Sequence, residues 1–328
     1  MRSLWNYLFS NPSQLARQID VMRKSEASLM EYAFRFGQQQ QQQGATSADE
    51  EKRAYDFQIL DTKIPKSSIT SLMFPSTQEC KLLGSTASSH GNNGMIMPGE
   101  DADYFIIHGV KLQKKQSKGN DTKDGTHNEA PLVLLHGYAN GALYFYRNLI
   151  GLANHFPHVF SLDLLGWGLS SRPSFDLVDK SVETAEAFFV ESLEQWRIQQ
   201  GIDTMILAGH SMGGYISIAY CEKYPQHVEK LVLISPVGVP HVDEEEEKHT
   251  MSKRMKDASI LWRMVIYLVR HLFENDITPG AFLRALPESR ARSMVSGYVT
   301  RRLPAITCKE EQESLIEYLV CVCALLLL

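Results

Sequence analysis

The segment Gly209-His210-Ser211-Met212-Gly213-Gly214 decides the fold of this chain. It follows the apolar run Met205 to Ala208 and precedes the helix-like stretch Tyr215 to Tyr224. A strand, a sharp turn and a helix with a serine at the tip form a nucleophile elbow of the pattern Gly-x-Ser-x-Gly. Glycines flank the serine because the turn is strained and the crossing backbones leave no room for a side chain. The segment predicts Ser211 as a catalytic nucleophile with Gly209 and Gly213 as its support; a structural glycine-rich turn is the alternative.

On both sides of the elbow, short apolar runs alternate with helix-like stretches. The runs Leu132 to Leu135, Val159 to Leu162 and Leu231 to Ile234 are typical of buried strands, and Ala142 to Ala153 is typical of a helix. Between Val182 and Trp196 apolar residues recur every three or four positions, which is one face of a helix. This alternation predicts an α/β fold with a mostly parallel sheet.

The composition of the chain changes along its length, which divides it into five parts. A polyglutamine tract, Gln38 to Gln43, marks a linker, and short β-type runs at Ser71 to Phe74 and Tyr104 to His108 suit antiparallel edge strands. After Pro240 only helix-like stretches follow, as expected of a lid. The predicted parts are an N-terminal helical segment (1–36), a low-complexity linker (37–63), the core (64–240), a helical lid (241–320) and an aberrant apolar tail (321–328).

The overall composition excludes several classes of protein. The chain has 328 residues with 33 Lys and Arg against 38 Asp and Glu, a net charge of −5, which argues against a nucleic-acid partner. Its 5 cysteines are odd in number and scattered, so we expect reduced thiols in a non-secreted protein. No apolar run reaches the roughly 18 residues that span a bilayer. We expect neither a metal nor a cofactor.

Acyl transfer at a serine also needs two backbone N–H groups that stabilise the oxyanion. One belongs to the residue after the nucleophile, Met212, and the other comes from the loop after the third strand. That loop is His136-Gly137-Tyr138. We therefore predict Met212 and Tyr138 as the donors, with Ala139 in reserve and His136 and Gly137 as support; a plain turn at the strand end is the alternative.

A base and an acid should follow the serine along the chain, in the order Ser, Asp or Glu, His. The position after the sixth strand is Ser235-Pro236, without a carboxylate, and the segment Cys321 to Leu328 holds neither Asp nor His. We expect the last strands, the acid and the base to be missing, as in a prematurely ended sequence, and the chain as written to be nearly inactive. The histidines after Ser211 that remain as candidates for the base are His227, His241, His249 and His271.

Two His-x-x-x-x-Asp patterns, a spacing that can mark acyltransferases, also occur. They are His158 to Asp163 and His271 to Asp276. The first runs through a predicted buried strand and the second through a predicted lid helix. We interpret both as coincidence.

Several stretches together resemble one group of α/β-hydrolases. They are His136-Gly137-Tyr138, the run Asp163-Leu164-Leu165-Gly166-Trp167-Gly168-Leu169-Ser170-Ser171-Arg172-Pro173, the elbow, and Glu317-Tyr318-Leu319. The group contains lipid acylhydrolases and acyltransferases: the lipid-droplet lipolysis co-activator of animals, the N-acylphosphatidylethanolamine lipase and the mitochondrial cardiolipin deacylase of fungi. The resemblance covers about residues 64 to 320 and implies the α/β-hydrolase fold with a helical lid.

This resemblance implies a serine hydrolase that acts on acyl esters of phospholipids or lysophospholipids. Acyl transfer to lysophosphatidic acid is one alternative, and a lipid-binding co-activator without catalysis is the other; Ser211 at the elbow favours an enzyme. We expect an intracellular protein on the surface of a mitochondrion, a lipid droplet or a cytoplasmic membrane. Aromatic and apolar residues at Leu4 to Phe9 and the helix-like stretch Leu261 to Leu272 would make that peripheral contact.

Overall fold

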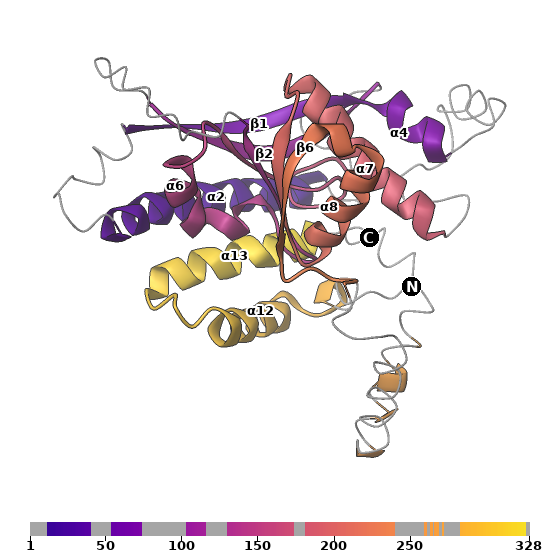
Figure 1. Ribbon diagram of the computed structural model, residues 1–328. Helices are drawn as coiled ribbons and strands as arrows, with labels where there is room; N and C mark the ends of the chain where they lie inside the picture. Colours follow the sequence, from indigo (N-terminus) through magenta and orange to yellow (C-terminus); the bar gives the residue numbers. More distant parts are fainter. Residues whose placement is uncertain are drawn as a thin grey trace.

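The structure is a computed structural model that describes residues 12–40, 54–73, 103–115, 130–173, 181–239 and 283–325, with shorter pieces between 259 and 271. Its centre is a mixed sheet in the order β1-β2-β4-β3-β5-β6 (Figure 1). The strands are β1 (Tyr55–Pro65), β2 (Tyr104–Lys114), β3 (Leu132–Leu135), β4 (Val159–Leu162), β5 (Met205–His210) and β6 (Val228–Ile234). β1, β2 and β4 pair antiparallel, whereas β4, β3, β5 and β6 pair parallel.

Helices cover both faces of this sheet. On one side lie α2 (Pro12–Gln40), the short helices η1 (Ala142–Phe145) and α6 (Tyr146–Ala153), α12 (Glu288–Arg302) and α13 (Lys309–Leu325), and on the other lie α4 (Lys66–Met73), α7 (Val182–Gln199) and α8 (Met212–Lys223) (Figure 1). A further short helix, η2 (Pro225–His227), leads into β6. The alternating side chains of β3 show how one strand serves two cores: Leu132 and Leu134 point to the first and Val133 and Leu135 to the second. The predicted α/β-hydrolase architecture is thus confirmed.

The structure corrects the sequence prediction at three places. Residues 71–73 belong to helix α4 and not to a strand. The predicted linker 37–63 contains the end of α2 up to Gln40 and most of strand β1. The predicted aberrant tail is helical as far as Leu325, because α13 continues through it and buries Cys321, Val322 and Cys323.

The packing of α13 against α2 brings the two ends of the described chain together. The hydroxyls of Ser28 and Ser314 share a hydrogen bond of 2.9 Å. In the first turn of α13, Glu311 accepts hydrogen bonds from the hydroxyl of Tyr146 (2.5 Å) and from Nε and Nη2 of Arg147 (both 2.7 Å). These contacts fasten α13 to α2 and α6, so that the helix forms part of the core.

β6 lies at an edge of the sheet. Among the described residues it pairs only with β5. The side chains from Leu231 to Ile234 are between 37% and 43% exposed, although all four are apolar. None of the described helices combines the length and apolar character required to cross a bilayer.

Candidate active site

The predicted nucleophile lies where the sheet meets α8. Ser211 follows the carboxyl end of β5 and has φ 54° and ψ −114°, in the left-handed region that residues other than glycine rarely adopt. Two backbone hydrogen bonds hold this conformation: the N–H of Ser211 donates to the carbonyl of Ile234 (3.0 Å), and its own carbonyl accepts from Val237 (3.1 Å). Backbone strain of this kind persists only where the surroundings fix it, and it is concentrated at functional sites.

The glycines around Ser211 are required by close approach of backbones. A Cβ at Gly209 would collide with the carbonyl of Gly213, and a Cβ at Gly213 would collide with the carbonyls of Leu135 and His136. β5, α8 and the end of β3 therefore cross at a distance that only glycine allows. This crowding lifts Ser211 out of the sheet.

The loop after β3 runs directly beside Ser211. A Cβ at Gly137 would lie 3.0 Å from the Cβ of Ser211 and 3.0 Å from Nδ1 of His210. The next residue, Tyr138, has its ring edge-on to Trp167 at 5.0 Å, and Ala139 turns the chain with φ 59°. Met212 is the first residue of α8, so its N–H has no acceptor within that helix. The loop and the helix thus meet at the serine; the roles of Tyr138 and Met212 as donors stay predictions.

The side chain of His136 holds the loop after β3 in place. It is fully buried; its Nδ1 donates to the carbonyl of Gly137 (2.8 Å) and its Nε2 accepts from the N–H of Leu164 (3.1 Å). Burial lowers the pKa of His136 to about 4. The ring is therefore neutral at pH 7, and because both nitrogens are engaged, His136 supports the loop and does not act as a base.

No base is placed at Ser211 within the described residues: no imidazole among them forms a hydrogen bond with its Oγ. His227 lies at the amino end of β5, because Met205 pairs with Val228, and a strand of this length separates it from Ser211 by roughly 20 Å. His271 is exposed and stacks on Tyr267. His241, His249 and Asp276 lie outside the described residues.

Two tyrosines, Tyr298 of α12 and Tyr144 of η1, link helix α12 to the elbow. The ring of Tyr144 stacks on His210 at 5.4 Å, and burial together with the neighbouring Tyr298 of α12 raises the pKa of Tyr144 to about 12. Tyr298, Tyr144 and His210 form a row from α12 to the residue before the nucleophile. That α12 and its neighbours act as a lid stays a prediction.

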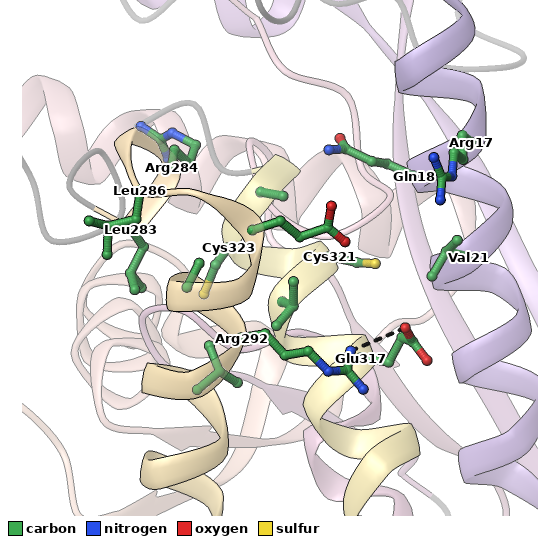
Figure 2. A pocket seen from close by; sticks show the side chains of 15 residues that line it. Arg17, Gln18, Val21, Leu283, Arg284, Leu286, Arg292, Glu317, Cys321 and Cys323 are labelled. Carbon is green, nitrogen blue, oxygen red and sulfur yellow. Dashed lines mark hydrogen bonds and ion pairs between the residues drawn. The ribbon is translucent and has the colours of Figure 1, made fainter.

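A cavity of about 400 Å³ opens between α2, residues 283–286, α12 and α13 (Figure 2). Its apolar wall includes Val21, Leu283 and Val295. Its charged lining holds three arginines and two glutamates, which are Arg17, Arg284, Arg292, Glu288 and Glu317. The guanidinium of Arg284 lies in electrostatic range of Tyr138, which connects the cavity to the loop beside Ser211. The sequence pattern did not predict this cavity because its lining comes from both ends of the chain.

The run from Asp163 to Pro173 forms a buried turn that locks onto β2. The hydroxyls of Ser170 and Ser171 accept from the N–H groups of His108 (2.9 Å) and Ile106 (2.7 Å). Both oxygens of Asp163 accept backbone N–H groups at 2.7 Å, from Ala142 and Leu169. His158 and Asp163 flank the two ends of β4, so their His-x-x-x-x-Asp spacing brings no shared site, as predicted.

One family model and several curated relatives match this chain. Residues 130–288 match the family described as alpha/beta hydrolase fold. A 1-acylglycerol-3-phosphate O-acyltransferase of Arabidopsis thaliana is 32% identical over 222 residues, 64% of this chain and 50% of that protein. The 1-acylglycerol-3-phosphate O-acyltransferase ABHD5 of Homo sapiens is 47% identical over 113 residues, 34% of this chain and 31% of that protein.

The same region is also similar to a lipase. The (lyso)-N-acylphosphatidylethanolamine lipase of Mus musculus is 46% identical over 111 residues, which cover 34% of this chain and 31% of the lipase. The matched part of this chain spans half or less of the length of these curated relatives.

Proposed function

Residues 130–288 of this chain belong to the α/β-hydrolase fold family, and from this premise we propose that the protein is a serine hydrolase of phospholipid or lysophospholipid acyl esters. The observation that carries the proposal is the strained Ser211 at the end of β5, with the loop at Gly137 packed against its Cβ. The names of the relatives, acyltransferases and a lipase that act on lipids, support the substrate class.

The reaction proceeds through an acyl-enzyme on Ser211. A general base removes the Oγ proton while Oγ attacks the ester carbonyl, and the N–H groups of Met212 and Tyr138 stabilise the oxyanion. The bond between the acyl carbon and the glycerol oxygen breaks, and the alcohol leaves with a proton. Water then attacks the acyl-enzyme and releases the fatty acid. The base is a residue that the structure does not place at Ser211.

The cavity beside Arg284 suits a single acyl chain that carries an anionic head. Val21, Leu283 and Val295 offer apolar contact, while Arg17 and Arg284 offer guanidinium groups that bind phosphate or carboxylate. Of the two carboxylates in the lining, Glu317 is paired with Arg292 at 3.2 Å, and Glu288 leaves one negative charge against two arginines. Because the charge of Arg284 interacts electrostatically with Tyr138, we propose that a head group held at Arg284 directs its ester toward the loop after β3.

A fluorophosphonate probe tests the nucleophile directly, because it reacts only with an activated serine. Because no base is placed at Ser211 among the described residues, we expect the 328-residue chain to label slowly and to release little fatty acid from lysophospholipid, and we expect Ser211→Ala to remove the labelling that remains. Ser67→Ala, which changes an exposed serine of α4, serves as the matched control. Labelling that persists in Ser211→Ala, or turnover without labelling, would contradict the proposal.

Acyl transfer to lysophosphatidic acid is the second candidate, favoured by the names of the Arabidopsis and human relatives. In this reaction Ser211 attacks the thioester of acyl-CoA and the CoA thiol leaves with a proton; the acceptor hydroxyl, in place of water, then takes the acyl group from the acyl-enzyme. Product that appears only with acyl-CoA and lysophosphatidic acid present would select this candidate over hydrolysis. If the chain binds lipid yet Ser211 never labels, the third candidate, a non-catalytic co-activator, is favoured.

We further propose that the protein works at a lipid surface inside the cell, either on a mitochondrion, a lipid droplet or a cytoplasmic membrane. Between residues 259 and 271, Ile260, Met264, Tyr267 and Leu268 are more than half exposed and recur at helical spacing. The predicted contact at Leu4 to Phe9 lies outside the described residues. Flotation with liposomes should fall on Tyr267→Glu and on deletion of residues 1–10, and unchanged flotation would rule out these contacts.

A further inference from the structure

Three polar side chains from distant parts of the sequence converge inside the first core. They are Glu26 of α2, His108 of β2 and Asp163 after β4, and they are 2%, 1% and 0% exposed. One donor atom from each lies within 4.8 Å of the other two. None of the three belongs to the elbow or to the loop after β3, so they are not part of the site at Ser211.

His108 is oriented as a ligand with a free lone pair. Its Nδ1 lies 2.7 Å from Oδ1 of Asp61, so a neutral ring donates its N–H to that carboxylate. The lone pair then lies on Nε2, which faces Oε2 of Glu26 at 3.4 Å without a hydrogen-bond partner among the described residues. A carboxylate behind the far nitrogen of an imidazole is the usual outer partner of a metal-binding histidine.

The carboxylate of Asp163 is held in one orientation by the backbone around it. Each of its oxygens accepts one backbone N–H, from Ala142 and from Leu169, and each keeps a second lone pair. Gly141 and Gly168 line the carboxylate, and a Cβ at Gly168 would overlap it. The surrounding backbone therefore makes room for this carboxylate and aims it.

Glu26 has no such support. Both of its carboxylate oxygens are buried without a hydrogen-bond donor in the described part of the chain. An ionised carboxylate in this state costs several kcal/mol unless a positive charge compensates it. Two buried carboxylates face one imidazole here, so the cluster has room for more positive charge than that ring can supply.

We propose that Glu26, His108 and Asp163 hold a divalent transition-metal cation, with Asp61 as the outer partner of His108. One imidazole nitrogen with two carboxylate oxygens suits Zn²⁺ or Mn²⁺, whereas Mg²⁺ and Ca²⁺ prefer oxygen ligands alone. The cation ties helix α2 to β2 and to the turn after β4. It is a structural site, independent of the acyl chemistry proposed for Ser211.

A proton is the competing occupant. Burial lowers the pKa of His108, but the carboxylates of Glu26 and Asp61 outweigh it and raise that pKa well above its usual value. A protonated ring would bridge Glu26 and Asp61 as an imidazolium and leave no lone pair for a metal. If the cluster holds a proton, it should not bind a metal; if it holds a metal, it should bind one cation per chain.

The test uses the full chain after dialysis against EDTA. Calorimetric titration with Zn²⁺ and with Mn²⁺ should show one site per chain and a rise in melting temperature, while Mg²⁺ at equal concentration should give neither. Glu26→Gln and His108→Gln should remove the site. Glu31→Gln, an exposed change on the same helix, should keep it. Asp61→Asn should weaken binding about 10–100-fold, as loss of an outer partner does.

Three outcomes would overturn the proposal. They are the lack of stoichiometric Zn²⁺ or Mn²⁺ in the wild type, equal binding by a folded Glu26→Gln variant, and a thiolate charge-transfer band on Co²⁺ substitution, which would place the metal at a cysteine. If Glu26→Gln fails to fold, the Asp61→Asn variant provides the test, because Asp61 is partly exposed. An unchanged affinity of that variant for Zn²⁺ or Mn²⁺ would then contradict the proposal. Failure of Ser211 to label leaves all these readouts unchanged.

Discussion

Single residues around Ser211 show that the site depends on close backbone packing and on buried hydrogen bonds. Gly213 is needed because backbone carbonyls occupy the place of its Cβ, and His136 is needed because its two nitrogens join Gly137 to Leu164. Neither contributes a reacting atom. Both can be tested through stability as well as through activity.

The first prediction concerns the crossing at Gly213. Gly213→Ala should lower the free energy of unfolding by about 2 kcal/mol or more and abolish fluorophosphonate labelling, because a Cβ there meets the carbonyls of Leu135 and His136. Gly297→Ala is the matched control: it lies in α12, its nearest neighbour is the flexible side chain of Arg301 at 3.4 Å, and it should be neutral or stabilising. Urea denaturation measures both.

The second prediction is a pH dependence that comes from His136. In the unfolded chain the ring takes up a proton near pH 6.5, whereas in the folded protein burial lowers its pKa to about 4. Between these values the unfolded state binds more protons, so stability falls as the pH falls, by up to about 1.4 kcal/mol per pH unit.

His136→Gln should reduce this loss. Between pH 7 and pH 5 the variant should lose about 2 kcal/mol less than the wild type does. Other groups titrate alike in both proteins, so the comparison isolates the ring at position 136. An identical pH slope in the two proteins would show that this histidine is not the cause.

At the level of elements, the docking of α13 depends on one buried carboxylate. Glu311 is 5% exposed and receives hydrogen bonds from Tyr146 and Arg147 of α6. Burial raises the pKa of Glu311, but the bonds from Arg147 and Tyr146 outweigh it and the pKa is lowered overall. Its contribution to stability is therefore present at neutral pH and is lost as the pH falls through that lowered pKa.

The third prediction follows from this contact. Glu311→Gln should destabilise the protein by about 2–3 kcal/mol at pH 7, since the guanidinium loses its charged partner. Glu313→Gln is the control, because Glu313 pairs with Arg292 on the surface with 61% of its side chain exposed, and such pairs contribute at most about 1 kcal/mol. Equal effects of the two substitutions in thermal unfolding would contradict a role for Glu311 in docking.

The elements also show what the sequence could and could not predict. β3, β4 and β5 were recognised because their apolar runs are short, continuous and followed by helix patterns. Residues 71–73 were misassigned since a short apolar run fits a strand and a helix alike. Most of β1 was missed because it lies within residues 37–63, which were assigned to a linker that begins with the glutamine tract.

The elbow could be predicted because its chemistry is contiguous, whereas the cluster around His108 is not. Glu26 did leave a signal that was overlooked. It occupies the buried face of α2, where Met22, Leu29 and Ala33 recur at helical spacing, and a carboxylate on such a face requires a partner from elsewhere.

For the whole molecule, we expect the exposed edge strand β6 to promote self-association in solution. Apolar side chains from Leu231 to Ile234 remain accessible on β6, and unpaired strand edges favour association between chains. The fourth prediction is that Val232→Lys, at the most exposed of these positions, lowers self-association while leaving the fold intact. Sedimentation velocity over a range of concentrations measures it.

The control for this change lies at the opposite edge. Ile59→Lys on β1 alters a side chain that is 55% exposed and should leave the sedimentation profile unchanged. If both substitutions reduce association equally, general charge repulsion explains the effect and the edge of β6 does not.

The contact between α2 and α13 also has a consequence for biosynthesis. Ser28 and Ser314 are 286 residues apart, so at typical elongation rates a ribosome needs roughly 15–60 s to translate the second helix after the first. During that interval α6 has emerged, but the side of α2 that α13 will cover stays open to solvent. The newborn chain therefore offers chaperones a helix with an uncovered apolar stripe until α13 has been translated.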